Sequence, residues 1–514
     1  MKKIPALLVI PLLIPCAALA GDVVIYHTGD IHGRFGPRPA ALYGSTSPVT
    51  AGGFAALAAL AGAEKSPALL LDSGDWSTGA PEGDLSGGLA AVRLMNAAGY
   101  SAAVIGNHEY DHGTAALEKA LAAAKFKPLG ANIFSGARRA PYAAPFVMLE
   151  AGGRRIAVIG LASPKTPLLT LGDVSALSFG PEKEALAAAL EETAKLSPDA
   201  VVVLAHDGLY TGDYVDGASW RPAEGAEASG TLALARAAGG RAQLVLGGHN
   251  HTLLLKPYRD PVSGALIGES GSGLLYATRA VLHFDDATGR FAGAEAAAVP
   301  LTGAEDPAVK AVYGAIAGET RAAMAVKLGE AAADIPREPG SAAYADSPIG
   351  SLFCDIIRAY AGTDLALQNT EGVRRGLVKG PVTFRDIYEV TPYDADLVTL
   401  RLTGAQIKAI MTEAVRGGRS DVQVSGLEVT YSSSAAGPYA LSLTAGGKPL
   451  DEGRGYSVAA NNFFLRSPRW KALAAGRGEV RKVLLRDIVV SAIRKSSGPL
   501  RPPEPGRIRP ASRP

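Results

Sequence analysis

Cysteine is almost absent from this sequence. Its 514 residues include 2 cysteines, Cys16 and Cys354, and Cys16 lies in a segment that we expect to be removed. The single remaining thiol cannot form an intramolecular disulfide. The folded chain must therefore be stabilised by its apolar core, even in an oxidising compartment.

Charge is sparse as well, and neither sign dominates. Charged residues make up 19% of the chain, and 51 Lys and Arg stand against 49 Asp and Glu. A protein that binds nucleic acid through a general positive field needs a clear basic excess. We therefore expect no nucleic-acid partner, and nothing in the composition calls for an obligate protein partner. Any attraction for phosphate must be local.

Long apolar runs are missing except at the N-terminus. Lys2 and Lys3 precede the apolar run Ala6–Leu13, and the small residues Ala18-Leu19-Ala20 follow it. This order is typical of a signal peptide, which we assign to residues 1–20. The alternatives are a membrane anchor, for which the run is short, and lipid attachment at Cys16, which Pro15 disfavours. We expect a secreted protein, in the periplasm, with no stable membrane insertion after cleavage.

Histidine is also scarce, yet 5 of the 8 histidines stand in short motifs rich in Gly, Asp and Asn. The motifs are Gly29-Asp30-Ile31-His32-Gly33, Gly74-Asp75, Gly106-Asn107-His108-Glu109, Ala205-His206-Asp207 and Gly248-His249-Asn250-His251. Nitrogen and oxygen ligands of this kind suit Zn, Mn or Fe. The set is large enough for two divalent metals that share a carboxylate.

Each of these motifs follows a short apolar run that reads as a buried strand. The runs are 23–26, 68–71, 102–105, 200–204 and 244–246, and helical stretches lie between them at 54–64, 88–98, 114–125, 182–195 and 231–238. Alternating strands and helices indicate an α/β layered domain. Sites in open α/β sheets form at the carboxyl ends of the strands, so the motif residues should converge. An extended segment would also point His249 and His251 the same way.

These motifs resemble those of the calcineurin-like metallophosphatases, and more closely those of the secreted 5'-nucleotidase / UDP-sugar hydrolase family. The resemblance implies a four-layer αββα sandwich followed by a smaller α+β substrate-binding domain. One metal would be held by Asp30, His32, Asp75 and His251, and the other by Asp75, Asn107, His206 and His249. Asp75 would bridge the two metals. His108 would be a catalytic residue oriented by Asp111, and Glu109 would hold the loop.

The activity that the resemblance implies is hydrolysis of nucleotide phosphoesters by a metal-bridging hydroxide. The partner would then be a small-molecule nucleotide or a related phosphoester. Two alternatives use the same scaffold: a cyclic-nucleotide phosphodiesterase, or a thiohydrolase of sulfur oxidation. A further alternative is a non-catalytic nucleotide-binding surface protein, although such a protein should have lost metal ligands.

The second half of the chain is expected to select the substrate. We place the metallophosphatase domain at 21–303, a linker helix at 304–335 and the C-terminal domain at 336–497. Helices are expected at 306–326, 347–360, 404–415 and 482–495, and strands at 396–402 and 422–431. By resemblance, Asn369 and Arg374 would contact the nucleotide, and Tyr393 and Phe463 would sandwich its base.

Some family features are missing. Residues 465–470 lack the Gly-Gly-Asp element that usually follows the aromatic corresponding to Phe463. Pro348 stands where an Arg is common, and Glu371 replaces a usual Gly. Two sugar or phosphate contacts are therefore lost, so phosphoester hydrolysis is better supported than specificity for a nucleotide.

The C-terminus carries six Pro and four Arg between Ser496 and Pro514, with few apolar residues. Such a composition buries too little surface to fold. We therefore predict that residues 498–514 form a disordered tail; the alternative is a basic segment that binds the cell envelope.

Overall fold

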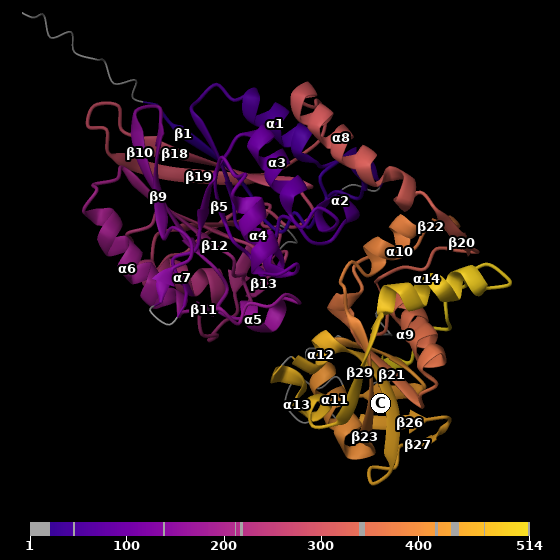
Figure 1. Ribbon diagram of the computed structural model, residues 1–514. Coiled ribbons are helices and arrows are strands. Elements are labelled where there is room, and N and C mark those ends of the chain that lie inside the picture. The colour runs from indigo at the N-terminus through magenta and orange to yellow at the C-terminus, as the bar shows by residue number, and fades with distance from the viewer. Residues whose placement is uncertain are drawn as a thin grey trace, which may run out of the picture.

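The computed structural model describes residues 21–511, except 45–46, 137–138, 211, 216–218, 339–344, 417–419, 433–440 and 467. The predicted signal peptide lies outside the described residues. Two domains follow one another along the chain, the first in indigo to magenta and the second in orange to yellow (Figure 1). Within the described ranges, no helix combines the length and apolarity needed to cross a membrane. Cys354 is buried as a free thiol.

The first domain contains two six-stranded sheets. One sheet runs β19-β18-β1-β4-β5-β6, in which β1, β4 and β5 are parallel. Its strands are β19 (Phe291–Pro300), β18 (Tyr276–Phe284), β1 (Val23–Thr28), β4 (Ala68–Asp72), β5 (Tyr100–Val104) and β6 (Lys127–Leu129). The other runs β16-β17-β15-β12-β10-β9. Its strands are β16 (Tyr258–Arg259), β17 (Leu266–Glu269), β15 (Leu244–Gly247), β12 (Ala200–Ala205), β10 (Arg154–Leu161) and β9 (Phe146–Ala151).

The two sheets pack face to face, and helices cover both outer faces. Alternate residues of β1 divide between the layers: Val23 and Ile25 belong to the core between the sheets, and Val24 and Tyr26 to the core under the helices. Figure 1 shows α1 (Phe54–Gly62), α3 (Leu89–Ala98) and α4 (Thr114–Leu121) on one side, and α6 (Glu182–Ala194) and α7 (Gly230–Ala238) on the other. The predicted four-layer αββα sandwich is confirmed. The central strands β1, β12 and β15 are buried along their whole length, as expected for strands that are covered on both faces.

The helix α8 (Pro307–Met324) follows the first domain, within the segment predicted to be a linker. Asp306 caps it by accepting hydrogen bonds from the N–H groups of Ala308 and Val309, and Pro307 occupies its first turn. Val309 and Ile316 are buried in the outer core of the first domain. The helix is therefore packed onto that domain, and the chain enters the second domain at β20 (Lys327–Ala331), which pairs with β22 (Gly380–Thr383).

The second domain is built on a five-stranded sheet of order β24-β21-β28-β23-β29. Its strands are β24 (Val422–Ser425), β21 (Leu365–Asn369), β28 (Gly455–Asn461), β23 (Asp396–Thr403) and β29 (Arg477–Leu484). One face packs against α9 (Pro348–Ala361) and α14 (Leu485–Lys495), and the other against α11 (Gly404–Ala414). The short helix α10 (Phe384–Val390) lies near α2 (Pro81–Asp84) of the first domain. This agrees with the predicted α+β character.

The expected strand 422–431 is two strands. β24 ends at Ser425, and β25 (Leu427–Tyr431) joins a separate sheet with β26 (Leu441–Ala445), β27 (Lys448–Pro449) and β30 (Ile508–Pro510). Gly426 lies between them at a φ of 75°, a conformation in which a Cβ is disfavoured. The chain changes sheets at this glycine, which an apolar run cannot reveal.

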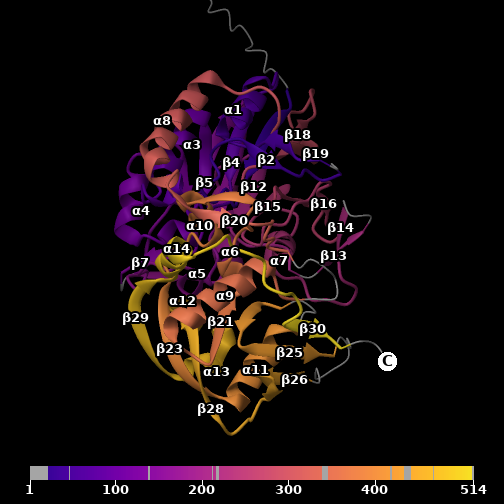
Figure 2. The ribbon, with the colours of Figure 1, turned by 90° about the vertical axis from the view of Figure 1, so that its right-hand side faces the viewer.

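The prediction of a disordered tail at 498–514 is wrong for the residues up to 511. β30 lies beside β25 and pairs with it in parallel (Figure 2). Ile508 of β30 is fully buried in the core. Arg507 donates two hydrogen bonds to Asp355, at 2.8 and 2.7 Å, and one to the carbonyl of Val424. One buried apolar residue is enough to hold this strand in place, because β25 supplies an edge for backbone hydrogen bonds. The composition of the tail cannot show that such an edge exists.

Candidate metal centre

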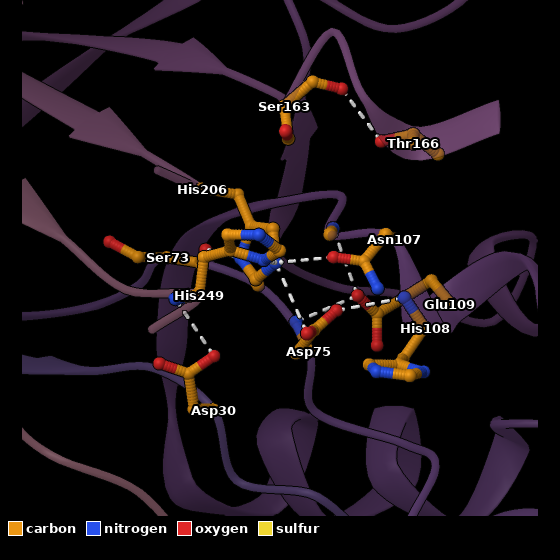
Figure 3. Close-up of polar contacts among 12 residues, drawn as sticks. Asp30, Ser73, Asp75, Asn107, His108, Glu109, Ser163, Thr166, His206 and His249 are labelled. Atoms are coloured by element: carbon orange, nitrogen blue, oxygen red, sulfur yellow. Dashed lines mark hydrogen bonds and ion pairs between the residues drawn. The ribbon is translucent and has the colours of Figure 1, made fainter. Parts of the chain in front are cut away.

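Five loops bring the predicted ligands together at one edge of the first domain. They follow β1, β4, β5, β12 and β15, each at the carboxyl end of its strand. In Figure 3, Asp75, Asn107, His206 and His249 point toward a common centre, with Asp30 beside them. Backbone approaches closely: a Cβ on Gly106 would lie 2.4 Å from Asp75 Oδ1, and one on Gly74 would lie 2.8 Å from His206 Nδ1.

Backbone strain is concentrated in these loops. Eight described non-glycine residues have a positive φ, and five of them are predicted ligands: Asp30 (53°), His32 (52°), Asp75 (60°), His249 (74°) and His251 (62°). The left-handed region costs free energy for residues with a Cβ and is enriched at functional sites. The left-handed backbone conformation is unfavourable for each of these residues alone, but it directs their side chains toward the centre of the site.

A first cluster consists of Asp30, His32 and His251, whose ligand atoms lie within 4.8 Å of one another. The Nε2 atoms of His32 and His251 are 2.9 Å apart, and His251 Nε2 lies 4.0 Å from Asp30 Oδ1. The other ring nitrogen of His32, Nδ1, lies 2.8 Å from the carbonyl oxygen of Thr78. Since a carbonyl only accepts, Nδ1 carries the proton and Nε2 presents a lone pair.

A second cluster consists of Asp75, His206 and His249. His206 Nε2 lies 3.1 Å from Asp75 Oδ2, 3.1 Å from Asn107 Oδ1 and 3.2 Å from His249 Nδ1. His206 Nδ1 donates to the carbonyl of Ser73 at 2.7 Å. Burial opposes the charged form of His206, but Asp75 raises its pKa to about 10, so the site favours positive charge between Nε2 and these two oxygens. In the neutral imidazole, a metal cation at this place would take the lone pair of Nε2.

The electrostatics of the buried groups fit metal ligation. Burial, together with Arg374, lowers the pKa of His32 and of His251 well below the usual range. Burial also lowers the pKa of His249 to about 3. Metal ligands must be deprotonated, so these neutral imidazoles are ready donors. Asp30 Oδ2 is buried without a hydrogen-bond partner. Buried polar atoms normally have a partner, so this oxygen fits the role of a metal ligand.

The segment from His249 to His251 is not extended, so the reason given above for its two imidazoles pointing the same way is wrong. Both histidines have a positive φ, and the N–H of Asn250 donates to the carbonyl of Gly248 in a tight turn. The turn sends His249 toward His206 and His251 toward His32. The two side chains therefore serve different clusters.

His108 lies at the rim of the centre, paired with Asp111. Its Nδ1 lies 2.7 Å from Asp111 Oδ2. Asp111 Oδ1 accepts hydrogen bonds from the Thr170 hydroxyl at 2.9 Å and from the Leu171 N–H at 3.0 Å. Burial opposes the charged form of His108, but Asp111 and Asp75 raise its pKa well above the usual range. The held carboxylate thus fixes the ring and favours an imidazolium.

The ligand atoms of His32, Asp75 and His108 also lie within 4.8 Å of one another, so proximity alone would allow His108 to be a ligand. We favour a separate role, because Asp111 holds its Nδ1 and Tyr393 stacks on its ring.

Glu109 organises the loop after β4. Its carboxylate accepts hydrogen bonds from the backbone N–H groups of Asp75, Trp76, Ser77 and Gly106, at 2.8 to 3.2 Å. It is buried and does not face the hollow beside the metal centre. Burial raises the pKa of Glu109 to about 7. It therefore positions Asp75, in agreement with the role expected of it.

The second domain closes the site from the other side. A hollow of about 650 Å³ is lined by Asp75, Asn107, His108, His249 and His251 of the first domain and by Asn369, Arg374, Tyr393 and Phe463 of the second. The Arg374 guanidinium lies 3.3 Å from His251 Nε2. Asn369 accepts a hydrogen bond from Asn461 at 2.8 Å. All four predicted substrate-binding residues therefore line the same hollow as the predicted metal ligands.

Several contributors were missed in the sequence. Ser73 and Thr78 act through backbone carbonyls, which carry no residue-type signal. Thr170 and Leu171 come from a loop far along the chain that contains no motif. Asn461, which donates to both Gln368 and Asn369, stands in the Asn461-Asn462-Phe463 run and could have been noticed there.

The three remaining histidines lie outside the clusters. His27 is buried against the hydroxyl of Ser73 at 2.8 Å. His112 faces Asp84 at 3.7 Å, and His283 faces Asp22 at 3.0 Å on β18.

Comparisons with known proteins agree with this geometry. Residues 23–253 match the model of the calcineurin-like phosphoesterases, and residues 327–470 match that of the 5'-nucleotidase C-terminal domain. Protein UshA of Yersinia enterocolitica is 25% identical over 481 residues, which cover 86% of this chain and 85% of that protein.

Solved structures show the same arrangement. The 5'-nucleotidase precursor from Thermus thermophilus superposes with a TM-score of 0.81 at 26% identity, covering 96% of this chain and 100% of its own. The sulfate thiohydrolase SoxB of Thermus thermophilus shares the fold, with a TM-score of 0.76 at 21% identity over 96% of this chain and 97% of its own. The chain thus belongs to the calcineurin-like phosphoesterases that carry a 5'-nucleotidase C-terminal domain, a family of metal-dependent phosphoric ester hydrolases.

Proposed function

We propose that the protein hydrolyses phosphoesters of nucleotides, in the manner of a 5'-nucleotidase or UDP-sugar hydrolase. The observation that carries the proposal is the shared hollow, in which the metal centre of the first domain meets Tyr393, Phe463 and Arg374 of the second. Such a hollow can hold a phosphate against the centre and a base between aromatic rings. Its volume of about 650 Å³ is in the range of small-molecule sites.

We propose two divalent ions, Zn, Mn or similar, as cofactors. Asp30, His32, Asp75 and His251 would hold one, and Asp75, Asn107, His206 and His249 the other. The lone pairs of His32 and His206 and the free oxygen of Asp30 support this fit. When bound, such ions supply a polarised phosphorus and an activated water. Asp75 lies between the clusters, which makes it the bridging residue.

The chain's own contribution to the reaction begins with His108. An imidazolium at the rim can donate a proton to the ester oxygen as it leaves. Asp111 keeps the ring in place through Nδ1, so Nε2 is free to face the substrate. We therefore assign His108 as the proton donor and Asp111 as its positioning residue.

Substrate recognition falls to the second domain. Arg374 lies close enough to His251 to reach a phosphate held at the first cluster. Tyr393 and Phe463 offer ring faces, and Asn369 lies in the amide network with Asn461. The missing Gly-Gly-Asp element leaves the ribose without its usual partner, so we expect broad rather than narrow nucleotide preference.

We further propose export to the periplasm, on the strength of the charged start and small-residue end of residues 1–20. We propose that the catalytic domain, expected at 21–303, also includes α8 of the expected linker 304–335, and that the substrate-binding domain, expected at 336–497, begins at β20 and includes β30. The packing of α8 on the first domain and the pairing of β20 with β22 support a joint between them near 325.

A substrate panel with metal analysis of the same preparation tests the proposal. The panel contains nucleoside mono- and diphosphates, cyclic nucleotides, nucleotide sugars and a small aryl phosphate. We expect turnover of nucleotides that is abolished by chelation. Turnover confined to cyclic nucleotides would favour a phosphodiesterase, and binding without any turnover would favour a non-catalytic binding protein.

A further inference from the structure

A second and larger hollow lies between the domains, next to the first. Its volume is about 1170 Å³, and it is lined by residues 32–39 of the loop after β1, by one side of α8 and by the β21–α10 region of the second domain. The two hollows share His251, Glu371 and Arg374. These residues form a partition, and His32 of the first metal cluster faces the larger hollow. We call the larger hollow the arginine cleft.

The arginine cleft carries an excess of positive charge. Seven arginines and three glutamates line it, so four positive charges are in excess. Glu389 pairs with Arg34 at 2.7 Å, with Arg385 at 3.5 Å and with Arg375. Glu371 pairs with Arg337 at 3.2 Å and with Arg374 at 3.7 Å, and Glu82 pairs with Arg385. All three glutamates are thus in ion pairs, and the excess of four positive charges remains.

Two of these arginines have no acidic partner within the described parts of the chain. Arg38 donates through Nη2 to the carbonyl of Gly273, and its Nη1 is buried without a hydrogen-bond partner. Burial and the neighbouring Arg34 lower the pKa of Arg38 to about 10. Arg321 projects from the exposed side of α8 and forms no ion pair there. A buried guanidinium donor without an acceptor is costly, so an anionic acceptor would relieve it.

From the excess charge, the orphaned donor of Arg38 and the contact with the first metal cluster, we propose that the arginine cleft is a second binding site for a phosphate group. Guanidinium groups match tetrahedral oxyanions through paired N–H donors. The inference rests on the proposed function, which makes phosphate the product formed on the far side of the Arg374–His251 partition. Phosphate released there enters the cleft on its way to solvent.

The same chemistry has two sources: free inorganic phosphate, or a distal phosphate carried by a substrate. Arg38→Gln is the informative change, because it removes the positive charge and the buried Nη1 donor but keeps a polar side chain of similar width. Arg321→Ala removes the second unpaired charge from an exposed helix position. Arg290→Ala, on the exposed turn before β19 and outside the cleft lining, is the matched control.

Equilibrium dialysis of the metal-loaded protein against labelled inorganic phosphate is the direct test. We expect two classes of phosphate site in the wild type and in Arg290→Ala. In the Arg38→Gln/Arg321→Ala protein, one class should weaken at least tenfold, which corresponds to about 1.4 kcal/mol, while the class at the metal centre remains. Arg38→Lys should restore part of the lost affinity.

The second source is tested by kinetics. If a distal phosphate occupies the cleft, the double variant should raise the KM of a nucleoside bisphosphate at least tenfold more than that of the monophosphate. Weaker phosphate binding in the dialysis experiment, or a larger rise in the KM of the bisphosphate in the kinetic experiment, supports the site. Unchanged KM ratios, together with either a single class of phosphate site in the wild type or two unchanged classes in the double variant, overturn it. Because dialysis needs no turnover, a protein that binds phosphate in the cleft yet hydrolyses nothing would sink the proposed function alone.

Discussion

The ring of Tyr393 is stacked on the imidazole of His108, with ring centroids 5.4 Å apart and an interplanar angle of 22°. Tyr393 belongs to the second domain and His108 to the first, so the contact links the substrate pocket directly to the catalytic rim. The Cζ atom of Arg374 lies over the same tyrosine ring, 5.9 Å from its centroid. A nucleotide base that enters the pocket must share this ring or displace it from His108.

The first prediction concerns the two aromatic rings of the pocket. If Tyr393 and Phe463 hold a base, each stack contributes ~1–3 kcal/mol. The double change to Ala should then weaken nucleotide binding roughly thirtyfold or more. Hydrolysis of a small aryl phosphate, which needs only the metal centre, should change little. Steady-state kinetics on both substrates make the comparison, with Tyr393→Phe as the ring-preserving control. Equal losses on both substrates would mean that the rings are structural.

The second prediction concerns the bridging carboxylate. Asp75→Asn keeps the shape of the side chain and tolerates the φ of 60°, but it removes the charge that both ions share. We expect the metal content to fall from about two ions per chain to less than one, with activity lost in parallel. Elemental analysis after dialysis measures this, and Asp173→Asn on an exposed loop is the control. Retention of both ions in Asp75→Asn would show that Asp75 does not bridge.

The third prediction separates His108 from the ligands. His108→Ala should keep its metals and lose roughly 10²–10⁴ in turnover, the scale of acid–base groups. Asp111→Asn should lose less, since it acts through the orientation of His108. Turnover and metal content are measured on the same samples. Loss of metal in His108→Ala would instead make it a ligand together with His32 and Asp75.

The fourth prediction concerns the ion pairs between the domains. Burial raises the pKa of Glu389, but Arg34 and Arg375 outweigh this effect and hold it below the usual value. A depressed pKa means that the stabilisation is present above the ordinary glutamate pKa of about 4.3 and is lost as the pH falls through the lower folded value. Wild type should therefore melt at a higher temperature than Glu389→Gln at pH 7, and the difference in melting temperature should close as the pH falls below the ordinary glutamate pKa and through the lower folded pKa.

Thermal unfolding from pH 7 downward measures this gap. Glu150→Gln, on an exposed position of β9, should show no such pH-dependent difference from wild type. A gap between wild type and Glu389→Gln that stays constant with pH would mean that packing, not charge, is what Glu389 contributes.

The fifth prediction concerns the C-terminal strand. Ile508 is fully buried beside β25, and its neighbour Arg509 is exposed. Ile508→Ala should destabilise the second domain by about 2–5 kcal/mol, as large-to-small changes in a core do. Arg509→Ala should be nearly neutral. Denaturant unfolding of both variants gives the comparison, and equal stability of the two would show that the tail is not docked.

Much of the first domain was determined by local sequence. The β1, β4, β5, β12 and β15 strands are short and apolar on both faces, so burial between two layers is their only favourable state. Their helices were expected to within a few residues, except at the end of α4. The order of motifs after the strands also predicted which residues meet, because parallel strands end at one edge of a sheet.

Other features depend on partners that are distant in the chain. The sequence cannot show that β30 finds an open edge at β25, because that edge is created by the fold of residues 427–445. Likewise, the left-handed turns at His249 and His251 are unfavourable on their own and persist because the surrounding loops hold them.

Residue types and spacing by themselves therefore predicted the layered catalytic domain and the proposed ligand set, while Tyr393 and Phe463 of the second domain were predicted from the resemblance of their sequence motifs. Tertiary structure alone decided the geometry between the domains. The stack of Tyr393 on His108 and the pair of Glu389 with Arg34 join residues that lie hundreds of positions apart. The burial of Arg38 Nη1 without a hydrogen-bond partner likewise depends on how the chain packs around it. Such contacts leave no local pattern, because the free energy that maintains them comes from the packing of whole domains.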